Sequence, residues 1–511
     1  MYKNEVVING KKFMFNFTHE PYYVDENIFV MGFPYNMKPK SFNETKVNEI
    51  KGYYIYVRYE SNYIEIISDI IANYRTYYME KDGILYFSND FLYLFNMLGK
   101  EEREPNKFEI EYWDKHRYTT GGETLCAKIH KIKPAHIYKF YPDKIEEKLY
   151  FKDIQNKPNR KKHFEEVLAD LRDTVSLIKK MPQKKFLLFS GGADSTLCVK
   201  LLQEQNVEFI PVFAKHTPTN SMNYDDILKV QCSAKLLDIE PVEIEVNTTK
   251  KIDKQIVDTM FMDRNISQLF YEITHVLKEK YGNDIIFING QAADAIFGYG
   301  PTEIGFRNVI TRHFLFRPFS FINRISLFIF QKKRENYRKF RVSKTEDEYL
   351  AAFFDEKFYM PLIDKSKSEF YFQKINDIIS GIRNNITNKN ALMMYLKADS
   401  YMQGSDNYVN VQSCETNGIK ALFLFVSPHI ISSTIENTDY IYEILHPKSI
   451  VYRIQKDVFN YTMPNIRKKK NYTIEVKQEK SFGDYEKEIY QNFYNKINSL
   501  EFVEPITIGE K

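Results

Sequence analysis

Short apolar runs alternate with amphipathic segments between residues 185 and 288, and this alternation is the feature that most limits the fold. The segments 196–205, 225–237 and 268–282 have apolar residues at helical spacing. The runs between them have the length of buried strands: KFLLF (185–189), VEFIPVF (207–213), PVEIEV (241–246) and DIIFI (284–288). Such alternation predicts an α/β domain with a parallel sheet and right-handed crossovers.

The first 150 residues have a different pattern, with short strands and few strong helices. Tyrosine and isoleucine are frequent in four runs: GYYIYVRYE (52–60), YIEIIS (63–68), ILYFSND (84–90) and KIHKIKPAHIYKFY (128–141). The segment KDIQNKPNRKK (152–162) has no apolar periodicity, which is typical of a linker. At 511 residues the chain is long enough for more than one core. We therefore expect two domains, 1–152 and 163–511, with a mainly helical C-terminal part beyond about residue 306.

Charge and cysteine content exclude several classes of protein. The 72 basic and 68 acidic residues leave a net charge of +4, which gives no dominant field for nucleic acid or membrane. No segment reaches about 20 clean apolar residues. Four cysteines lie far apart without a C-x-x-C pair, which favours a reducing compartment: Cys126, Cys198, Cys232 and Cys414. These observations predict a cytoplasmic protein with no nucleic-acid or membrane partner.

The segment SGGADS (190–195) directly follows the first predicted strand, where ligands of open parallel sheets bind. Gly191 and Gly192 allow close backbone approach, and their amides would face an anion together with the helix N-terminus. Ser190 and Ser195 can donate hydrogen bonds to the same anion. Asp194 fits such a place if Mg²⁺ lies between it and phosphates. The simpler interpretation is an ordinary capped turn.

A second segment, NGQAADAIFGYG, repeats this design after the strand at 284–288. It places Gly290 and Gln291 before a second acidic residue, Asp294. The simpler interpretation is a tight turn with Asp294 as a helix N-cap.

The first segment resembles the S-G-G-x-D-S loop of ATP pyrophosphatases, and the second resembles the G-E-G-x-D-E-x-F-G-G-Y segment of asparagine and β-lactam synthetases. The resemblance implies that ATP is cleaved between its α and β phosphates and that Asp194 and Asp294 bind magnesium pyrophosphate. Phe189 is a candidate contact for the adenine, although aromatic residues at such sites more often belong to the core. HPKSIVYR (446–453) resembles the family's K-x-x-L-R and implies that Lys448 and Arg453 face phosphates.

The segment MPNIRKKKNY (463–472) resembles the family's L-P…R-x-K and implies a catalytic lysine that faces the acyl-adenylate. Lys469 is the candidate, although the sequence leaves open which of Lys468, Lys469 and Lys470 points inward. Residues 398–415, ADSYMQGSDNYVNVQSCE, are similar to the D-R-x-S-M segment of the family.

The N-terminal strands resemble the family's glutaminase domain, an α+β sandwich of the Ntn-hydrolase type. Tyr2 stands where glutamine-using members have their nucleophilic cysteine. A phenol with a pKa of about 10 stays protonated at neutral pH and cannot replace a thiolate. In the second loop Gln291 replaces the glutamate of asparagine synthetases and cannot act as a base, while Ala292 and Ala295 replace a glycine and an acid.

The resemblance implies an ATP-dependent, AMP-forming amide synthetase, and the departures predict that it lacks glutaminase activity. Its substrate carries a carboxylate and an amine, as in β-lactam synthetases and lasso-peptide cyclases, which close a ring in a small molecule or a peptide. Three alternatives remain at this point: an amidotransferase that uses free ammonia on an amino acid or sugar acid, a tRNA-thiolating enzyme, and a degenerate scaffold. The sequence leaves open whether the protein forms a homodimer and whether it acts with other biosynthetic proteins.

Overall fold

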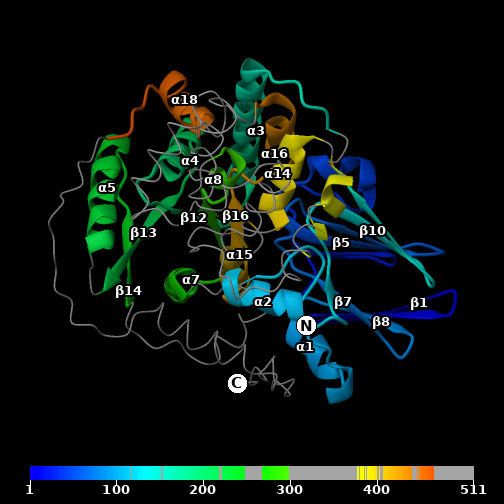
Figure 1. Ribbon diagram of the computed structural model, residues 1–511. Coiled ribbons are helices and arrows are strands. Elements are labelled where there is room, and N and C mark those ends of the chain that lie inside the picture. Colours follow the sequence, from blue (N-terminus) through cyan, green and yellow to red (C-terminus); the bar gives the residue numbers. More distant parts are fainter. Residues whose placement is uncertain are drawn as a thin grey trace, which may run out of the picture.

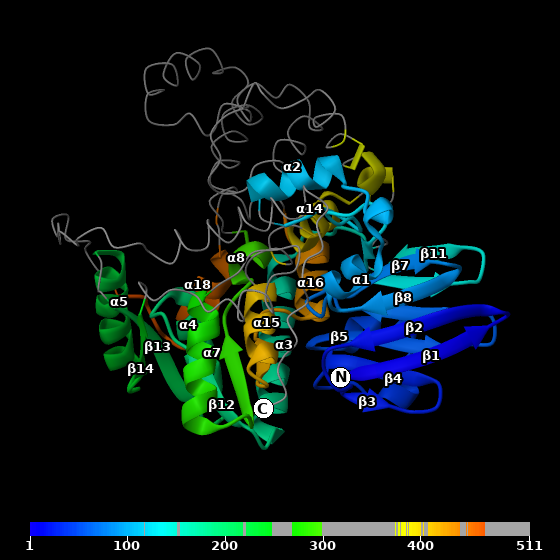
Figure 2. The same cartoon turned by 90° about the horizontal axis from the view of Figure 1, so that it is seen from below.

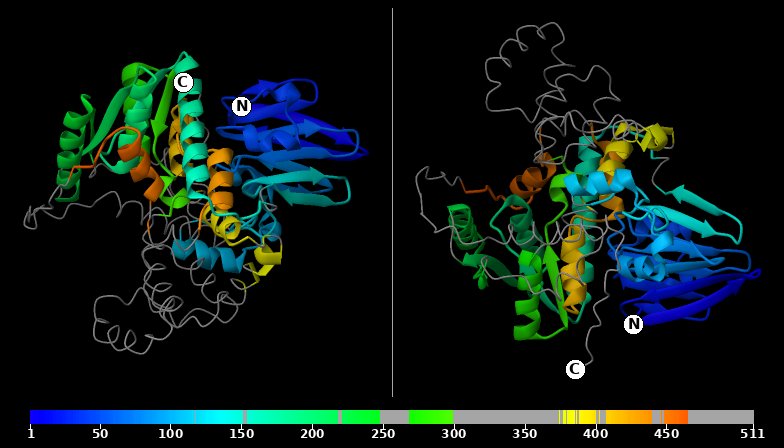
Figure 3. Two further views of the ribbon diagram at one scale, coloured as in Figure 1. Left: turned by 90° about the horizontal axis from the view of Figure 1, so that it is seen from above. Right: turned by 60° about the horizontal axis from the view of Figure 1, so that its bottom comes forward.

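The computed structural model describes residues 1–116, 118–150, 154–217, 221–247, 268–298, 374, 377–378, 380–384, 386, 388–399, 402, 407–439, 446 and 448–464. An N-terminal pair of β-sheets lies beside a parallel sheet, with the long helix α3 (Arg160–Lys180) between them (Figure 2, Figure 3). Among the described helices, none has the length and apolarity needed to cross a membrane.

The two N-terminal sheets pack face to face. One has the order β1-β2-β8-β7-β9, in which β2 and β8 are parallel, and the other is the antiparallel sheet β11-β10-β6-β5-β4-β3. Phe15 and Phe29 meet across the two sheets with ring centres 5.2 Å apart, and Phe87 and Phe140 meet at 5.0 Å. The expected sandwich is therefore present, while its kinship with glutaminases stays a prediction.

The strands of this sandwich are β1 (Tyr2–Ile8), β2 (Lys11–Phe17), β3 (Tyr23–Val24), β4 (Ile28–Phe33), β5 (Tyr53–Tyr59), β6 (Ile64–Ser68), β7 (Tyr77–Lys81), β8 (Ile84–Ser88), β9 (His130–Lys131), β10 (His136–Phe140) and β11 (Ile145–Leu149). Two helices accompany them, α1 (Phe91–Met97) and α2 (Lys107–His116).

The third sheet lies outside the sandwich, is fully parallel and has the order β14-β13-β12-β15-β16 (Figure 1). Its strands are β12 (Lys184–Leu188), β13 (Ile210–Thr217), β14 (Val242–Asn247), β15 (Ile285–Asn289) and β16 (Lys420–Phe423). The chain builds outward from β12 through β13 to β14 and then returns to place β15 on the other side of β12. The strand order therefore reverses between β12 and β15, which is the point where open α/β sheets bind ligands.

The predicted strands and helices between residues 185 and 288 are all present. The helices are α4 (Ala193–Glu204), α5 (Ser221–Leu237) and α7 (Gln268–Tyr281). The boundaries differ by a few residues: α5 begins four residues before the predicted start at 225, and β13 begins three residues later than the apolar run at 207. Its polar end, Lys215–Thr217, continues the strand because those residues pair in register with β14.

The predicted linker is partly wrong, because α3 already begins at Arg160. Asn159 caps this helix by accepting a hydrogen bond from the backbone N–H of Lys162 at 3.0 Å. α3 packs against α16 (Pro428–Asn437), and Lys51 of the sandwich forms ion pairs with Asp170 and Asp173 of α3. Because buried side chains of both parts form one connected core, the division at 152 and 163 stays a prediction.

The described residues beyond 374 are mainly helical, as expected. The helices are α14 (Lys389–Lys397), α15 (Asn407–Thr416), α16 and α18 (Ser449–Asp457).

Candidate active site

The first predicted loop connects β12 to α4 and requires its glycine. Gly191 has φ +67°, and a Cβ atom there would lie 2.7 Å from the carbonyl carbon and oxygen of Lys229 in α5. Ser233, also on α5, donates a hydrogen bond to the Gly191 carbonyl at 3.1 Å. The Ser190 and Ser195 hydroxyls hydrogen-bond to each other at 3.3 Å, so both lie on the inside of the turn. The loop is thus held from behind by α5, with its hydroxyls gathered at the end of β12.

The second predicted loop follows β15, the strand next to β12. At Gly290, a Cβ atom would lie 3.1 Å from Cβ of Asp194, so the two loops are in van der Waals contact. The backbone N–H of Gln291 donates to Asn289 Oδ1 at 3.1 Å. Ala292 has φ +71°, a conformation that glycine adopts more easily, and it precedes the short helix α8 (Ala293–Ile296) that carries Asp294.

Lys448 joins the acidic residues of the two loops. Its Nζ lies 2.6 Å from Asp194 Oδ2 and also forms an ion pair with Asp294 Oδ1. Lys448 precedes α18, and its backbone N–H donates to the carbonyl of Phe297, directly after α8, at 2.9 Å. Gln455 of α18 donates to the carbonyl of Ala193 at 2.8 Å. Helix α18 is therefore bound to both loops, above the ends of β12 and β15 (Figure 1).

The charges of this group are set by burial and by mutual attraction. Burial alone would lower the pKa of Lys448, but Asp194 and Asp294 outweigh it and hold that pKa above its usual range. The lysine therefore remains an ammonium at neutral pH. Burial raises the pKa of Asp194, and the adjacent Lys448 opposes this rise.

The carboxylates fit the Mg²⁺ that the resemblance implies. Asp194 Oδ1 is buried and has no hydrogen-bond partner within the described part of the chain. Mg²⁺ commonly takes one or two carboxylates from the protein and its other oxygen ligands from substrate phosphates and water. Asp194 and Asp294 would supply those carboxylates. Within the described residues, no group of three His, Cys, Asp or Glu side chains is close enough to hold a metal without a substrate.

Three other predicted site residues are not seen beside Asp194 and Asp294. Two of them contact other side chains, and the third lies outside the residues that the structure describes. Phe189 is completely buried, its N–H donates to the carbonyl of Val212 at 2.8 Å, and its ring belongs to the core. Arg453 is half-exposed on α18, with an ion pair to Asp457 and its guanidinium 4.4 Å from the ring centre of Phe164. Lys469, with Lys468 and Lys470, lies outside the described residues. Contacts of Phe189 with adenine and of Arg453 with phosphate stay predictions.

The sequence did not indicate Ser233 and Gln455, which donate hydrogen bonds to the carbonyls of Gly191 and Ala193 at the first loop. Ser233 is a small polar residue on the inner face of α5, and its only sequence signal is its position in a helix that follows a parallel strand. Gln455 lies just beyond the segment HPKSIVYR, and its burial within α18 was not visible from the sequence.

The N-terminal sandwich holds no activated nucleophile at Tyr2 or Cys126. Burial raises the pKa of the Tyr2 phenol, whose oxygen accepts a hydrogen bond from Asn4 at 3.2 Å. Burial likewise raises the pKa of the Cys126 thiol. Both groups are therefore protonated and weakly nucleophilic at neutral pH.

The chain has the topology of an α/β protein whose acidic residues meet at the strand-order reversal. No protein-family model matches it, and no curated protein sequence matches it either. Among solved structures it is similar to the U34-tRNA thiolase NcsA from Methanococcus maripaludis with its [4Fe-4S] cluster, at 13% identity and a TM-score of 0.22. That similarity covers 48% of this chain and 80% of the thiolase. Similarity at this TM-score does not establish the fold or the chemistry of this chain. The fold is defined by the sheet order.

Proposed function

We propose that the protein is an ATP-dependent, AMP-forming amide synthetase that closes a ring in a peptide or small molecule, without hydrolysing glutamine. The observation that carries the proposal is the meeting of Asp194 and Asp294 on Lys448 at the ends of β12 and β15. This arrangement suits a diphosphate group, since it combines a glycine loop, a helix N-terminus, two carboxylates and a fixed ammonium.

The first step adenylates a carboxylate. A substrate carboxylate oxygen attacks the α-phosphorus of ATP, the bond to the bridging oxygen breaks, and pyrophosphate leaves with that electron pair. Lys448 stabilises the charge that develops on the phosphate oxygens, and the loop at Gly191 and Gly192 lets the backbone approach them. When bound, Mg²⁺ neutralises phosphate charge and orients the leaving group.

The second step forms the amide. The amine nitrogen attacks the carbonyl carbon of the acyl-adenylate, AMP leaves, and the amine loses one proton. Gln291 can hold the amine through its side-chain carbonyl, but it cannot accept the proton. The proton passes to solvent water, and AMP keeps the electron pair of the broken C–O bond. In this proposal Lys469 stabilises the tetrahedral adduct and Arg453 turns from Asp457 to a phosphate.

The test is pyrophosphate release and AMP formation from ATP, measured by the intact protein with a panel of carboxylates that also carry an amine. Asp194→Asn should reduce the rate by about 100-fold or more, since each preplaced group at such a site contributes several kcal/mol to catalysis. Glu204→Gln is the matched control, because Glu204 lies on the same helix and only pairs with Arg172 at the surface. Equal rates for D194N and the wild type would contradict the proposal.

A second candidate is a scaffold without catalysis. The observation in its favour is that Lys448 already pairs with both carboxylates, while Ala292 and Ala295 replace a glycine and an acid of the family's segment. A scaffold would show no heat of ATP or pyrophosphate binding in calorimetry, with or without Mg²⁺. The amidotransferase alternative would instead show ammonium-dependent turnover in the absence of glutamine.

A further inference from the structure

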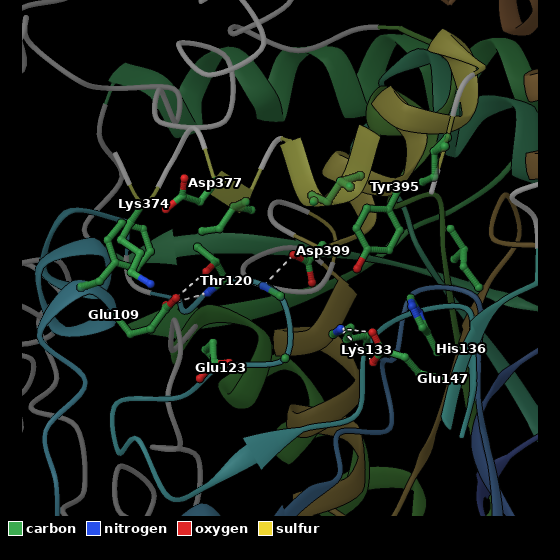
Figure 4. A pocket seen from close by; sticks show the side chains of 18 of the residues that line it. Glu109, Thr120, Glu123, Lys133, His136, Glu147, Lys374, Asp377, Tyr395 and Asp399 are labelled. Carbon is green, nitrogen blue, oxygen red and sulfur yellow. Dashed lines mark hydrogen bonds and ion pairs between the residues drawn. The ribbon is translucent and has the colours of Figure 1, made fainter. Parts of the chain in front are cut away.

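A second site lies away from the candidate active site, in a cavity of about 740 Å³ between the sandwich and α14 (Figure 4). Its walls come from described residues in three parts of the chain, around Thr120, Glu147 and Tyr395, and neither Asp194 nor Asp294 is among them. Cavities of about 300–1,000 Å³ at the junction of two parts of a protein are the usual places for small organic ligands. Phe108, Leu149 and Ile382 supply apolar surface for the body of such a ligand.

Acidic and basic side chains both line the cavity. Five acidic residues line the cavity: Glu109, Glu123, Glu147, Asp377 and Asp399. Three lysines line it as well: Lys133, Lys148 and Lys374. The Lys133 ammonium is committed to Glu147, with its Nζ 2.7 and 2.9 Å from the two carboxylate oxygens. Burial raises the pKa of Glu109 to about 8, so this residue is uncharged at neutral pH. Burial also raises the pKa of Asp399, and the charges of Lys131, Arg75 and Lys133 oppose that rise. The choice of ligand therefore depends on the hydrogen bonds of Asp399 and not on the summed charge of the wall.

One carboxylate oxygen of Asp399 is buried without a hydrogen-bond donor in the described part of the chain. Asp399 is 1% exposed, and its Oδ2 accepts a hydrogen bond from the backbone N–H of Gly121 at 2.7 Å. Its Oδ1 is buried and has no hydrogen-bond partner in the described part of the chain. Figure 4 shows this side chain at the middle of the cavity, between Thr120 and Tyr395. A buried carboxylate oxygen without a donor is costly, and a cationic donor in the cavity would satisfy it.

His136 adds an acceptor to the same wall. Its Nδ1 lies 2.7 Å from the carbonyl of Pro134, and because a carbonyl only accepts, Nδ1 carries the proton. Burial lowers the pKa of His136 to about 4, so the ring is neutral and its Nε2 holds a lone pair. The histidine therefore offers no positive charge that could satisfy Asp399.

We propose that this cavity binds a small organic molecule through a primary ammonium group that donates to Asp399 Oδ1. Gly121 makes the site possible, because its φ of +49° turns its amide toward Oδ2 and leaves the other oxygen for the ligand. The three donors of an ammonium match the acceptors on this wall, and the apolar residues contact the carbon skeleton.

Helix α14 connects the cavity to the candidate active site. Tyr395 of this helix lines the cavity, and Asp399 follows the helix end. Lys397 of the same helix donates to the carbonyl of Ala295 at 2.8 Å, next to Asp294. The ammonium compound could be the amine substrate or an effector of the synthetase. Its role therefore rests on the proposed function, whereas its binding does not.

The test is calorimetric titration of the full chain, without ATP, with 1,4-diaminobutane, with the neutral 1,4-butanediol and with the anionic succinate. We expect saturable binding of the diamine at least about tenfold tighter than that of the diol, the usual effect of one charge-assisted hydrogen bond. This contrast in the wild type needs no variant. Asp399→Asn keeps an acceptor for Gly121 and should weaken diamine binding by about tenfold or more.

Glu146→Gln is the matched control, since this exposed carboxylate pairs with Lys144 outside the cavity and should leave the affinity unchanged. Urea unfolding of D399N separates a lost ligand contact from a lost fold. Diamine binding that is absent, no tighter than diol or succinate binding, or unaffected in D399N would overturn the proposal. With ATP and a carboxylate present, labelled diamine recovered in an amide marks a substrate, and unchanged diamine with altered pyrophosphate release marks an effector. Absent ATP chemistry with intact diamine binding would refute only the proposed function.

Discussion

Gly191→Ala tests whether the first loop is held against α5 as the structure places it. The φ of +67° costs an alanine about 1–2 kcal/mol, and the less flexible unfolded chain returns about 0.4–1 kcal/mol. The new Cβ would also lie 2.7 Å from the Lys229 carbonyl and 2.8 Å from the Val230 nitrogen, both backbone atoms that cannot rotate away. Overpacking of this kind costs about 1–3 kcal/mol. We expect a loss of about 2–4 kcal/mol in the free energy of unfolding.

Gly282→Ala separates the two contributions. Gly282 has φ +83° in the same α/β part of the chain, and a Cβ atom there would meet nothing within 4 Å. Its loss should be about 1 kcal/mol or less, from the backbone conformation alone. Urea unfolding followed by circular dichroism gives both values from the shift in midpoint at constant slope. Equal losses in G191A and G282A would refute the close approach of the loop to α5, and with it the geometry of the phosphate site.

Two further predictions concern buried charges. Lys51→Met should lower the free energy of unfolding by about 3–5 kcal/mol, because it leaves Asp170 buried opposite an uncharged side chain. Lys144→Met, which breaks the exposed pair with Glu146, should cause no measurable loss in the same urea titration, and similar losses would contradict the role of Lys51. Burial raises the pKa of Glu109 to about 8, so the folded protein keeps a proton that the unfolded chain loses above its ordinary pKa of about 4.3. The wild type should therefore lose stability relative to Glu109→Gln as the pH rises from about 4.3 to about 8, by at most about 1.4 kcal/mol per pH unit, and a constant difference between pH 5 and 8 would contradict this.

The sequence predicts the α/β part well, because the hydrophobic periodicity and the positions of the glycine residues indicate the same element boundaries there. The runs at 185–189 and 207–213 each lead to a helical pattern, and the helical pattern at 268–282 ends at Gly282 before the run at 284–288, so the type of these elements can be predicted. The start of α3 was missed because a run of basic residues hides its apolar face until Val167 and Leu171. The cap at Asn159 was the available signal.

The site was predictable only in part. The two loops follow strands, so their position at one edge of the sheet is a consequence of parallel pairing. Lys448 is 254 residues from Asp194, and only the folded chain shows that it joins both acids. The cavity beside Asp399 was not foreseen either, because its carboxylates have no common sequence motif and meet through packing of α14 on the sandwich.

The location of the site and its chemistry have separate supports. The strand order β14-β13-β12-β15-β16 reverses between β12 and β15, which is where open α/β sheets bind ligands whatever side chains stand there. The glycine loop and the paired carboxylates then favour a metal-bound diphosphate over an uncharged ligand. G191A therefore tests the location and D194N tests the chemistry. If G191A behaves as predicted and D194N leaves pyrophosphate release unchanged, the position of the first loop against α5 is supported and the synthetase proposal is refuted.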